Sequence, residues 1–571
     1  MRVRVMICDG VIAAAATAAR SVGVMAVVGA VVAGCGGCLS AGRSMPQSDT
    51  IGPMTAQRRA ELTQRIEALA AQRQAAAATA LGSVPETPVT VPPEGPLRLT
   101  IEQAMLLALQ HNQALVVERL NPPIARTAVE MERAVFDPVM TAEYALSRTK
   151  IQPDKPVAQI NEGGLRDSGG SVGARQYLPT GTLIETDLAT DRIRTLAPGR
   201  YDTSRAGLTL TQALLRGYGL DVNLVGLRQA RLDVLSSRYE LRGFTEALLA
   251  AVQEAYWSDV LAQRRIAIFE DSLKLAEKQL NETQERINVG RLAETELAAA
   301  QAEVALRQES LINARSAQAT VRLGLLRLLN PPGAGLWSRP IDTESRPAVP
   351  SAVGDDVEYH VALALRLRSD LNQARLGVQR NDLELVRTRN GLLPRMDLFV
   401  ALGRSGYADS FSRSVKDIFD GHSRDATVGM VFELPPLNRD ARARHQRAEL
   451  SRQQAAEALA NLEQLVQVDV RAACIEVRRT REQVTATAAT RTFQEENLRA
   501  ETEKFRVGKS TTLLVAQVQR DLLSAQIAEI EAVVNHMIAV VDLYRLDGSL
   551  LIRCGIQAPG DEPVTLGGVG M

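Results

Sequence analysis

The chain has 571 residues, of which 66 are basic and 66 acidic, so its formal net charge is zero. A neutral chain argues against nucleic-acid binding, which requires a basic surface to displace counterions. Phe, Tyr and Trp number only 9, 9 and 2, too few for several ordinary globular cores. The five His are scattered, and no motif has the spacing of metal ligands or a catalytic triad. We therefore expect no enzymatic activity, no metal and no cofactor.

The N-terminus predicts a signal peptide over residues 1–34. Arginines precede an apolar run at 21–34, which is too short to span a bilayer. The run ends in Val-Ala-Gly-Cys, which is similar to a bacterial lipoprotein box and makes Cys35 the candidate lipidated residue. An ordinary signal peptide cleaved near this position is the alternative. Either reading predicts export, with the proline-rich stretch 35–96 as an N-terminal spacer.

The rest of the chain contains an internal repeat. Ala108 and Ala364 are 256 residues apart, whereas Gly290 and Gly508 are 218 apart. The offset changes because a longer segment separates the matched positions in the first copy. This pattern predicts a duplicated scaffold with loops of different length. We assign 97–335 to the first repeat, 336–355 to a linker, 356–550 to the second repeat and 551–571 to a C-terminal tail.

Each repeat is expected to open with a short helix, Thr100 to His111 or Val357 to Arg368, and to continue into a second helix that ends near a proline. In the first copy, Pro122-Pro123 falls inside this second helix. Proline removes a backbone donor and its ring clashes with the preceding turn. We therefore predict a break in the helix at this point.

A long helix without proline is predicted later in each repeat, between Gly219 and Gly290 and between Asn438 and Gly508. At 1.5 Å per residue each stretch would span about 105 Å. Glycine favours the left-handed backbone that ends many helices. Gly290 and Gly508 are therefore expected to form tight turns, after which a shorter helix returns.

Strands are predicted between the second helix and the long helix of each repeat. Apolar and polar residues alternate at 140–147 and 396–403, with returning strands at 207–212 and 427–434. The segment 182–190 extends one hairpin. The glycine pairs at 163–164 and 169–170 are expected to lie in an exposed loop.

About four strands per chain cannot close a barrel, and an open sheet edge is unfavourable in lipid. Three chains would supply about twelve strands, enough for a closed barrel. The long helices would then stand side by side as a cylinder. A trimeric fibrous spacer without a lumen is the structural alternative.

Several motifs occur in a characteristic order: LTIEQAMLLALQHNQAL, the prolines before the strands, TLTQALLRGYGLDVNLVGLRQA, EAYWSDVL, and the tips RINVGR and FRVGKS. Together they resemble the TolC family of outer-membrane efflux proteins over about residues 97–550. The resemblance implies a mainly α fold with a small β part. Its duplicated helical hairpins would form a trimeric α-helical tunnel, capped by a 12-stranded transmembrane β-barrel with four strands per protomer.

The resemblance also implies a function. A homotrimer in outer-membrane lipid, with a long periplasmic helical extension, would act as the passive exit duct of a tripartite efflux pump for small molecules. A periplasmic adaptor (membrane fusion) protein and an inner-membrane transporter would be its partners. An outer-membrane channel for type I protein secretion is one alternative. A lipid-anchored periplasmic coiled-coil scaffold without a pore is another.

The turns between the long and returning helices are the predicted adaptor-docking tips. Family members often close the periplasmic end with acidic residues six and nine positions after the second tip glycine. Leu514 and Gln517 stand there in this chain. With Glu296 of the first repeat, they mark the predicted periplasmic constriction. The predicted docking residues are Val289, Gly290, Arg291, Val507, Gly508 and Lys509.

Overall fold

A computed structural model describes residues 3–4, 96–151, 163–194, 200–290, 293–332, 336–347, 356–507, 509–557 and 564. Cys35, Arg291 and Gly508 lie outside these residues, as do nearly all of the predicted signal peptide and spacer. The chain divides into two compact units, and each takes segments from both repeats. Unit 1 includes 133–225 and 386–446, whereas unit 2 includes 86–132, 226–385 and 447–571.

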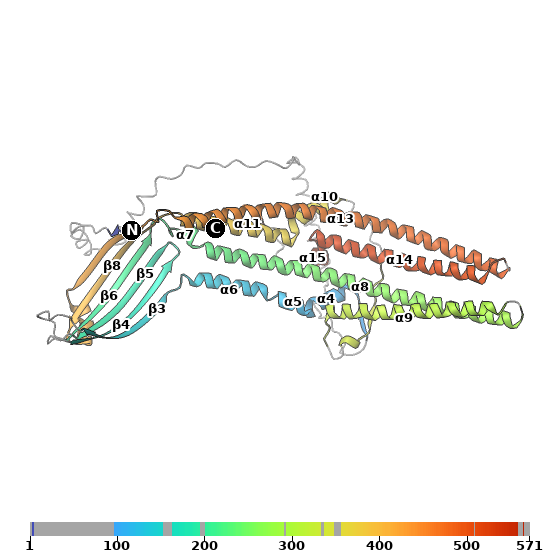
Figure 1. Cartoon of the computed structure of the whole chain (residues 1–571), viewed down its shortest axis with the longest axis horizontal. Helices are drawn as coiled ribbons and strands as arrows, with labels where there is room; N and C mark the ends of the chain where they lie inside the picture. Colours follow the sequence, from blue (N-terminus) through green and yellow to red (C-terminus); the bar gives the residue numbers. More distant parts are fainter. Residues whose placement is uncertain are drawn as a thin grey trace, which may run out of the picture. The chain divides into compact units, whose positions relative to one another are not determined.

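Unit 1 is built on an antiparallel sheet of six long strands (Figure 1). Their order across the sheet is β9-β8-β6-β5-β4-β3, and the two-residue strand β1 (Val3–Arg4) pairs with β9. A short helix, α7 (Leu220–Asn223), follows β6, and α12 (Phe411–Asp420) connects β8 to β9. The strands are β3 (Val139–Ile151), β4 (Gly163–Leu178), β5 (Thr182–Arg194), β6 (Arg200–Ala213), β8 (Arg395–Ala408) and β9 (Arg424–Glu433).

The sheet has two more long strands than the four that the sequence predicted. The glycine pairs at 163–164 and 169–170, expected in a loop, lie within β4. A Cβ at Gly169 would stand 2.4 Å from the Asp191 carboxylate on the neighbouring strand. A Cβ at Gly173 would stand 2.8 Å from the Thr186 carbonyl oxygen. The backbone contact at Gly173 leaves no room for a side chain, whereas the Asp191 carboxylate beside Gly169 could move. The glycines of β4 hide the alternation from which strands are predicted.

Unit 2 is mainly helical, and both repeats supply the same succession of helices. The long helices are α8 (Val225–Asn288) and α13 (Arg439–Arg506), and the returning helices α9 (Thr295–Leu329) and α14 (Thr512–Leu546) have 35 residues each. The predicted helical hairpins are therefore confirmed. The other helices are α4 (Ile101–His111), α5 (Gln113–Glu118), α6 (Asn121–Ala134), α10 (Val357–Leu367), α11 (Ser369–Gly391), α15 (Leu550–Arg553) and the 3₁₀ turn η1 (Leu336–Ser338).

The break predicted at Pro122-Pro123 is present. Helix α5 ends at Glu118, and α6 begins at Asn121. Both prolines thus fall in the first turn of α6, where their missing N–H groups would have no helical partner. Helix α11, the counterpart in the second repeat, has no proline and continues for 23 residues.

Several equivalent positions in the two repeats are buried to the same extent. Ala108 and Ala364, which are 256 residues apart, are both fully buried. Leu325 and Leu543, which are related by the offset of 218, are also fully buried. The repeat in the sequence is therefore a repeat in the structure.

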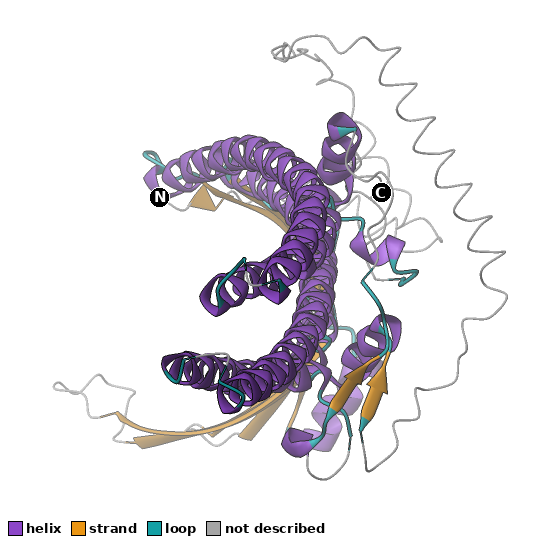
Figure 2. Cartoon of the chain, turned by 90° about the vertical axis from the view of Figure 1, so that its right-hand side faces the viewer, coloured by secondary structure: helices purple, strands orange, loops and turns teal. Residues whose placement is uncertain are grey.

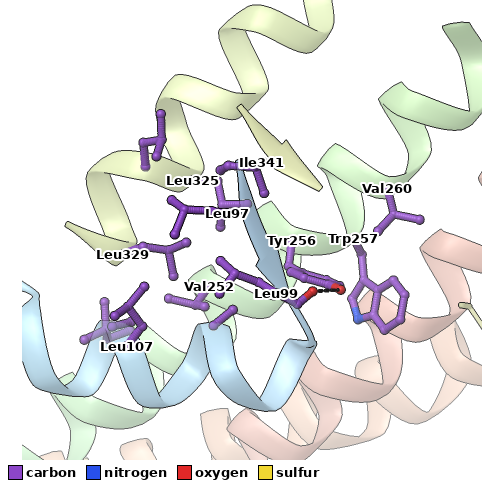
Figure 3. Close-up of a cluster of buried hydrophobic side chains, with 14 of the residues drawn as sticks. Leu97, Leu99, Leu107, Val252, Tyr256, Trp257, Val260, Leu325, Leu329 and Ile341 are labelled. Carbon is purple, nitrogen blue, oxygen red and sulfur yellow. Dashed lines mark hydrogen bonds between the residues drawn. The ribbon is translucent and has the colours of Figure 1, made fainter. Parts of the chain in front are cut away.

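Each repeat has its own apolar core in unit 2. In the first, Leu97 and Leu99 of β2 (Leu97–Leu99) pack among α4, α8 and α9 (Figure 3). Strand β2 pairs in parallel with β7 (Ile341–Thr343), and the Tyr256 hydroxyl donates to the Leu99 carbonyl over 2.9 Å. The second core packs residues of α10, α11, α13 and α14.

The four long helices of unit 2 lie side by side in a curved layer (Figure 2). Arg315 of α9 pairs with Glu270 of α8 over 2.8 Å, and Arg491 of α13 pairs with Glu529 of α14 over 2.6 Å. The two hairpins are joined by an ion pair between Arg265 of α8 and Glu531 of α14. In the part of the chain that the structure describes, no helix is both long and apolar enough to cross a membrane.

Candidate functional site

One face of the sheet in unit 1 is apolar and exposed. The register places Ile184, Leu210, Val400 and Val428 in one row across β5, β6, β8 and β9. On β3 the same face carries Met140, whose side chain is 82 % exposed. A continuous apolar face of this kind is unfavourable in water and indicates a surface that another apolar phase covers. Further exposed members of this face are Tyr144, Leu146, Val172, Leu188, Leu402, Met430 and Phe432.

The opposite face is polar and rich in glycine and carboxylates. One row across the sheet reads Thr141, Gly173, Asp187, Gly207, Gly403 and Asp425. A Cβ at Gly207 would stand 2.4 Å from Asp187 Oδ1, and a Cβ at Gly403 would stand 2.5 Å from Asp425 Oδ1. The glycines thus let both carboxylates lie across the neighbouring strand. Arg205 donates to Asp425 over 2.7 Å.

A sheet with one apolar and one polar face can separate lipid from water. Strands of transmembrane barrels alternate in this way, with apolar residues toward the lipid and polar residues toward the lumen. The alternation at 140–147 and 396–403 indicates the apolar face. The acidic residues Glu185, Asp187 and Asp191 also alternate, and this alternation is the sequence signal for the polar face.

Helix α12 packs on the apolar face at the strand ends farthest from the connections to the helices. The Ser414 and Ser204 hydroxyls are hydrogen-bonded over 2.7 Å and both side chains are buried. Gly406 permits this approach, since a Cβ there would stand 2.0 Å from the Ser414 carbonyl oxygen. The sequence pattern does not predict this helix, which is short and lies between two strands.

The two hairpin turns lie at the same end of unit 2 (Figure 1). The guanidinium of Arg286, near the end of α8, stands 5.0 Å over the ring of Phe505, near the end of α13. Val289 and Val507 are 68 % and 67 % exposed. The two predicted apolar tip residues are therefore alike in exposure and lie on neighbouring hairpins.

The first turn has the predicted glycine geometry. Gly290 has a φ of 75° and donates its N–H to the Ile287 carbonyl over 2.9 Å. Only glycine takes this left-handed backbone at little cost. At the start of α9, Glu294 precedes the helix without capping it through its side chain.

The second turn is held by polar contacts. Lys504 pairs with Glu501 over 2.9 Å, and the Ser510 hydroxyl donates to the same carboxylate. The hydrogen bond from Ser510 is the main cause that lowers the pKa of Glu501, and the hydrogen bond from Lys504 is the second. Thr511 caps α14 by accepting the Leu514 N–H over 3.3 Å. Lys509, another predicted docking residue, donates its backbone N–H to the Lys504 carbonyl over 2.8 Å.

The predicted constriction residues lie in the first two turns of two neighbouring helices. Leu514 and Gln517 are exposed on α14, and three residues apart they share a helix face. Glu296 is half-buried in the first turn of α9. The two helices are adjacent, since Arg520 of α14 lies 4.0 Å from Glu303 of α9. Among the described residues, no three His, Cys, Asp or Glu are grouped to hold a metal ion.

Comparisons with known proteins agree with this architecture. A family model described as outer membrane efflux protein matches residues 105–331 and 361–549. A membrane protein from Pseudomonas aeruginosa has a similar structure, with a TM-score of 0.60, 20 % identity, and coverage of 78 % of this chain and 90 % of the other. The Campylobacter jejuni CmeC outer membrane channel gives a TM-score of 0.58, 16 % identity, and coverage of 79 % and 86 %.

The Neisseria gonorrhoeae MtrE outer membrane channel, in its open state, gives a TM-score of 0.55, 18 % identity, and coverage of 79 % of this chain and 89 % of the other. At these identities the likeness concerns the fold. A search of curated proteins found no match.

Proposed function

This chain belongs to the outer membrane efflux protein family, and from that premise we propose that it is the passive exit duct of a tripartite efflux pump for small molecules. It is an outer-membrane efflux channel with an α-helical tunnel in the periplasm. The family consists of transport proteins rather than enzymes, and its channels are trimers that work with other efflux components.

The observation that carries the proposal is the two-faced sheet. Its apolar face suits the hydrocarbon of a bilayer, and its polar face, with Asp187 and Asp425, suits an aqueous lumen. A scaffold without a pore would have no need of a sheet with these two faces. Transport energy would come from an inner-membrane transporter, because a duct of this kind performs no chemistry of its own.

Two exposed apolar stripes in unit 2 support a homotrimer. One lies on α5, α6 and the residues between them, and the other lies on α13. Cyclic assembly requires two different surfaces on each chain, so that one stripe of each copy meets the other stripe of the next. The first stripe is Val117, Leu120, Ile124 and Met131; the second is Leu450, Leu465, Val468, Ile475 and Phe493.

We assign adaptor docking to the two hairpin turns, with Leu514, Gln517 and Glu296 as the periplasmic constriction. Val289 and Val507 offer exposed apolar side chains that a partner's helical hairpins can cover. A ring of Leu514 side chains would restrict the opening by excluding water. Lipidation of Cys35 would add a second attachment to the membrane, since two or three acyl chains bind stably.

Efflux in whole cells tests this assignment. The double variant Val289→Asp and Val507→Asp places a charge on each tip without requiring a new backbone conformation, so the fold should change little. We expect normal trimers in the outer membrane, with adaptor cross-linking and efflux of a fluorescent dye reduced at least tenfold.

The matched control is Gln301→Glu with Asn497→Asp, which adds the same charge at exposed helix positions away from the turns. It should retain cross-linking and efflux. Normal efflux by the tip variant would reject docking at these valines.

A further inference from the structure

The first repeat contains an additional β-hairpin, β4–β5, inserted between β3 and β6. Between the matched proline and glycine, the first repeat has 152 residues (Pro138 to Gly290) and the second 114 (Pro394 to Gly508). Strands β4 and β5, with 16 and 13 residues, account for most of this difference. Most of the additional residues therefore form strands of the sheet rather than a loop.

The hairpin is a full member of the sheet. Strand β4 pairs with β3 along the whole of β3, from Val139 with Arg175 to Ile151 with Gly163. Strand β5 pairs with β6 from Thr182 with Gln212 to Arg194 with Arg200. Both strands are therefore paired over the same length of the sheet as the neighbouring strands β3 and β6.

The turn of the hairpin, residues 179–181, is also built into unit 1. Ala213 donates its N–H to the Gly181 carbonyl over 3.0 Å, and Gly219 donates to the Thr180 carbonyl over 3.2 Å. The Asn223 side chain donates to the Pro179 carbonyl over 3.0 Å. The turn is therefore held at the same end of the sheet as the connections to the helices.

The two faces continue across the hairpin without interruption. Val172 and Leu188 lie opposite each other on the apolar face, and Gly173 and Asp187 lie opposite each other on the polar face. A hairpin outside the barrel wall would not need this agreement with its neighbours, because a slip of one residue would reverse both faces.

We propose that three copies of this chain close an eighteen-stranded barrel, six strands from each, and that the resulting wide duct admits bulky hydrated solutes. The proposal rests on the trimeric efflux duct proposed above. Barrel diameter grows roughly in proportion to strand number, so eighteen strands give an opening about 1.5 times as wide as twelve. Barrels of this size leave an aqueous channel.

A deletion that removes only the additional hairpin tests the inference. The variant Δ152–199 joins Ile151 to Arg200. Arg148 and Arg200 lie in the same row of the sheet, because Arg148 pairs with Arg166, Arg166 with Arg194, and Arg194 with Arg200. In the variant these two residues would pair directly, and residues 149–151 become a three-residue hairpin loop. Removing two strands leaves β3 antiparallel to β6 with the same faces outward. The control Δ154–160 shortens the connection between β3 and β4 and keeps all six strands.

The channel of trimers in planar bilayers is probed with polyethylene glycols of increasing size, which are added to the compartment that the barrel opens into. The measurement is the radius of the largest polymer that enters the channel. We expect the wild type and Δ154–160 to admit distinctly larger polymers than Δ152–199, with a limiting radius about 1.5 times greater. The same size limit for trimeric wild type and trimeric Δ152–199 would overturn the wide barrel and leave the trimeric duct standing. Wild-type protein that is not trimeric by light scattering would overturn both.

Discussion

At the scale of single residues, the most unusual group is a buried ion pair in α8. Arg242 is fully buried, Glu246 is 4 % exposed, and Arg242 Nε donates to Glu246 Oε1 over 3.1 Å. Burial is the main cause that raises the pKa of Glu246 to about 7, although Arg242 acts in the opposite direction. The carboxylates of Asp547 and Asp370 raise it further. Unit 2 therefore contains a carboxyl group that titrates near neutral pH.

This shift predicts a pH dependence of stability. Because the pKa of Glu246 is raised from 4.5 to about 7, the folded state binds the proton more tightly than the unfolded state. Stability should then fall as the pH rises through this range, by about 3 kcal/mol at most. We expect the thermal midpoint of the wild type, relative to Glu246→Gln, to decrease between pH 5 and pH 8. Parallel pH profiles for the two proteins would contradict the assignment.

Single residues also show where sequence reasoning succeeded and where it failed. The prolines at 122 and 123 and the glycine at 290 act on the backbone within one turn, so their effects were visible in the sequence. Gly169 and Gly173 act through neighbours on other strands, Asp191 and Thr186, which no local pattern reveals. The local pattern therefore predicts a loop where the structure has strand β4.

At the scale of elements, the two hairpins differ in how their returning helices begin. Thr511 caps α14, whereas Glu294 does not cap α9 through its side chain. An N-cap hydroxyl typically contributes about 1 kcal/mol. The first turn of α14 should therefore exchange its amide hydrogens more slowly than the first turn of α9.

The variant Thr511→Ala tests this difference. Loss of the cap should raise hydrogen exchange at Leu514 and Val515, whose N–H groups bond to Thr511, about fivefold, with no change in α9, because about 1 kcal/mol of local stability is removed. Thr511→Ser, which keeps the hydroxyl, is the control. Equal exchange in wild type and Thr511→Ala would show that the cap does not hold this turn.

The elements themselves were predicted well where periodicity and breakers agree. Both helical hairpins were found because two long stretches lack proline and end at glycine. Strand number was underestimated, since β4 has few apolar residues with which to alternate. Helix α12 depends on a contact between segments distant in sequence, that of Ser204 with Ser414. Predictions for the tips and the constriction stay untested, because they concern surfaces that face partners.

At the scale of the whole molecule, the two exposed stripes predict how copies assemble. Ile124 and Met131 represent the stripe on α5–α6, and Val468 and Ile475 represent the stripe on α13; all four are more than half exposed in one chain. A charge buried in an apolar interface without a partner is strongly unfavourable. We expect Ile124→Asp with Met131→Asp, and separately Val468→Asp with Ile475→Asp, to yield monomers in mild detergent. Ile124→Val with Met131→Leu should remain trimeric.

Co-expression of the two charged variants distinguishes a ring of unlike surfaces from a symmetric pairing of like surfaces. Each variant keeps one intact stripe, so one variant's α5–α6 stripe can still meet the other's α13 stripe. Only one such contact can form between the two chains. The two stripes left free in the resulting heterodimer are the charged ones, so a third chain cannot bind. Native mass spectrometry should therefore find heterodimers and no closed trimers. If like stripes paired with like, each variant alone would instead form homodimers through its intact stripe, and that result would reject the cyclic arrangement on which the duct depends.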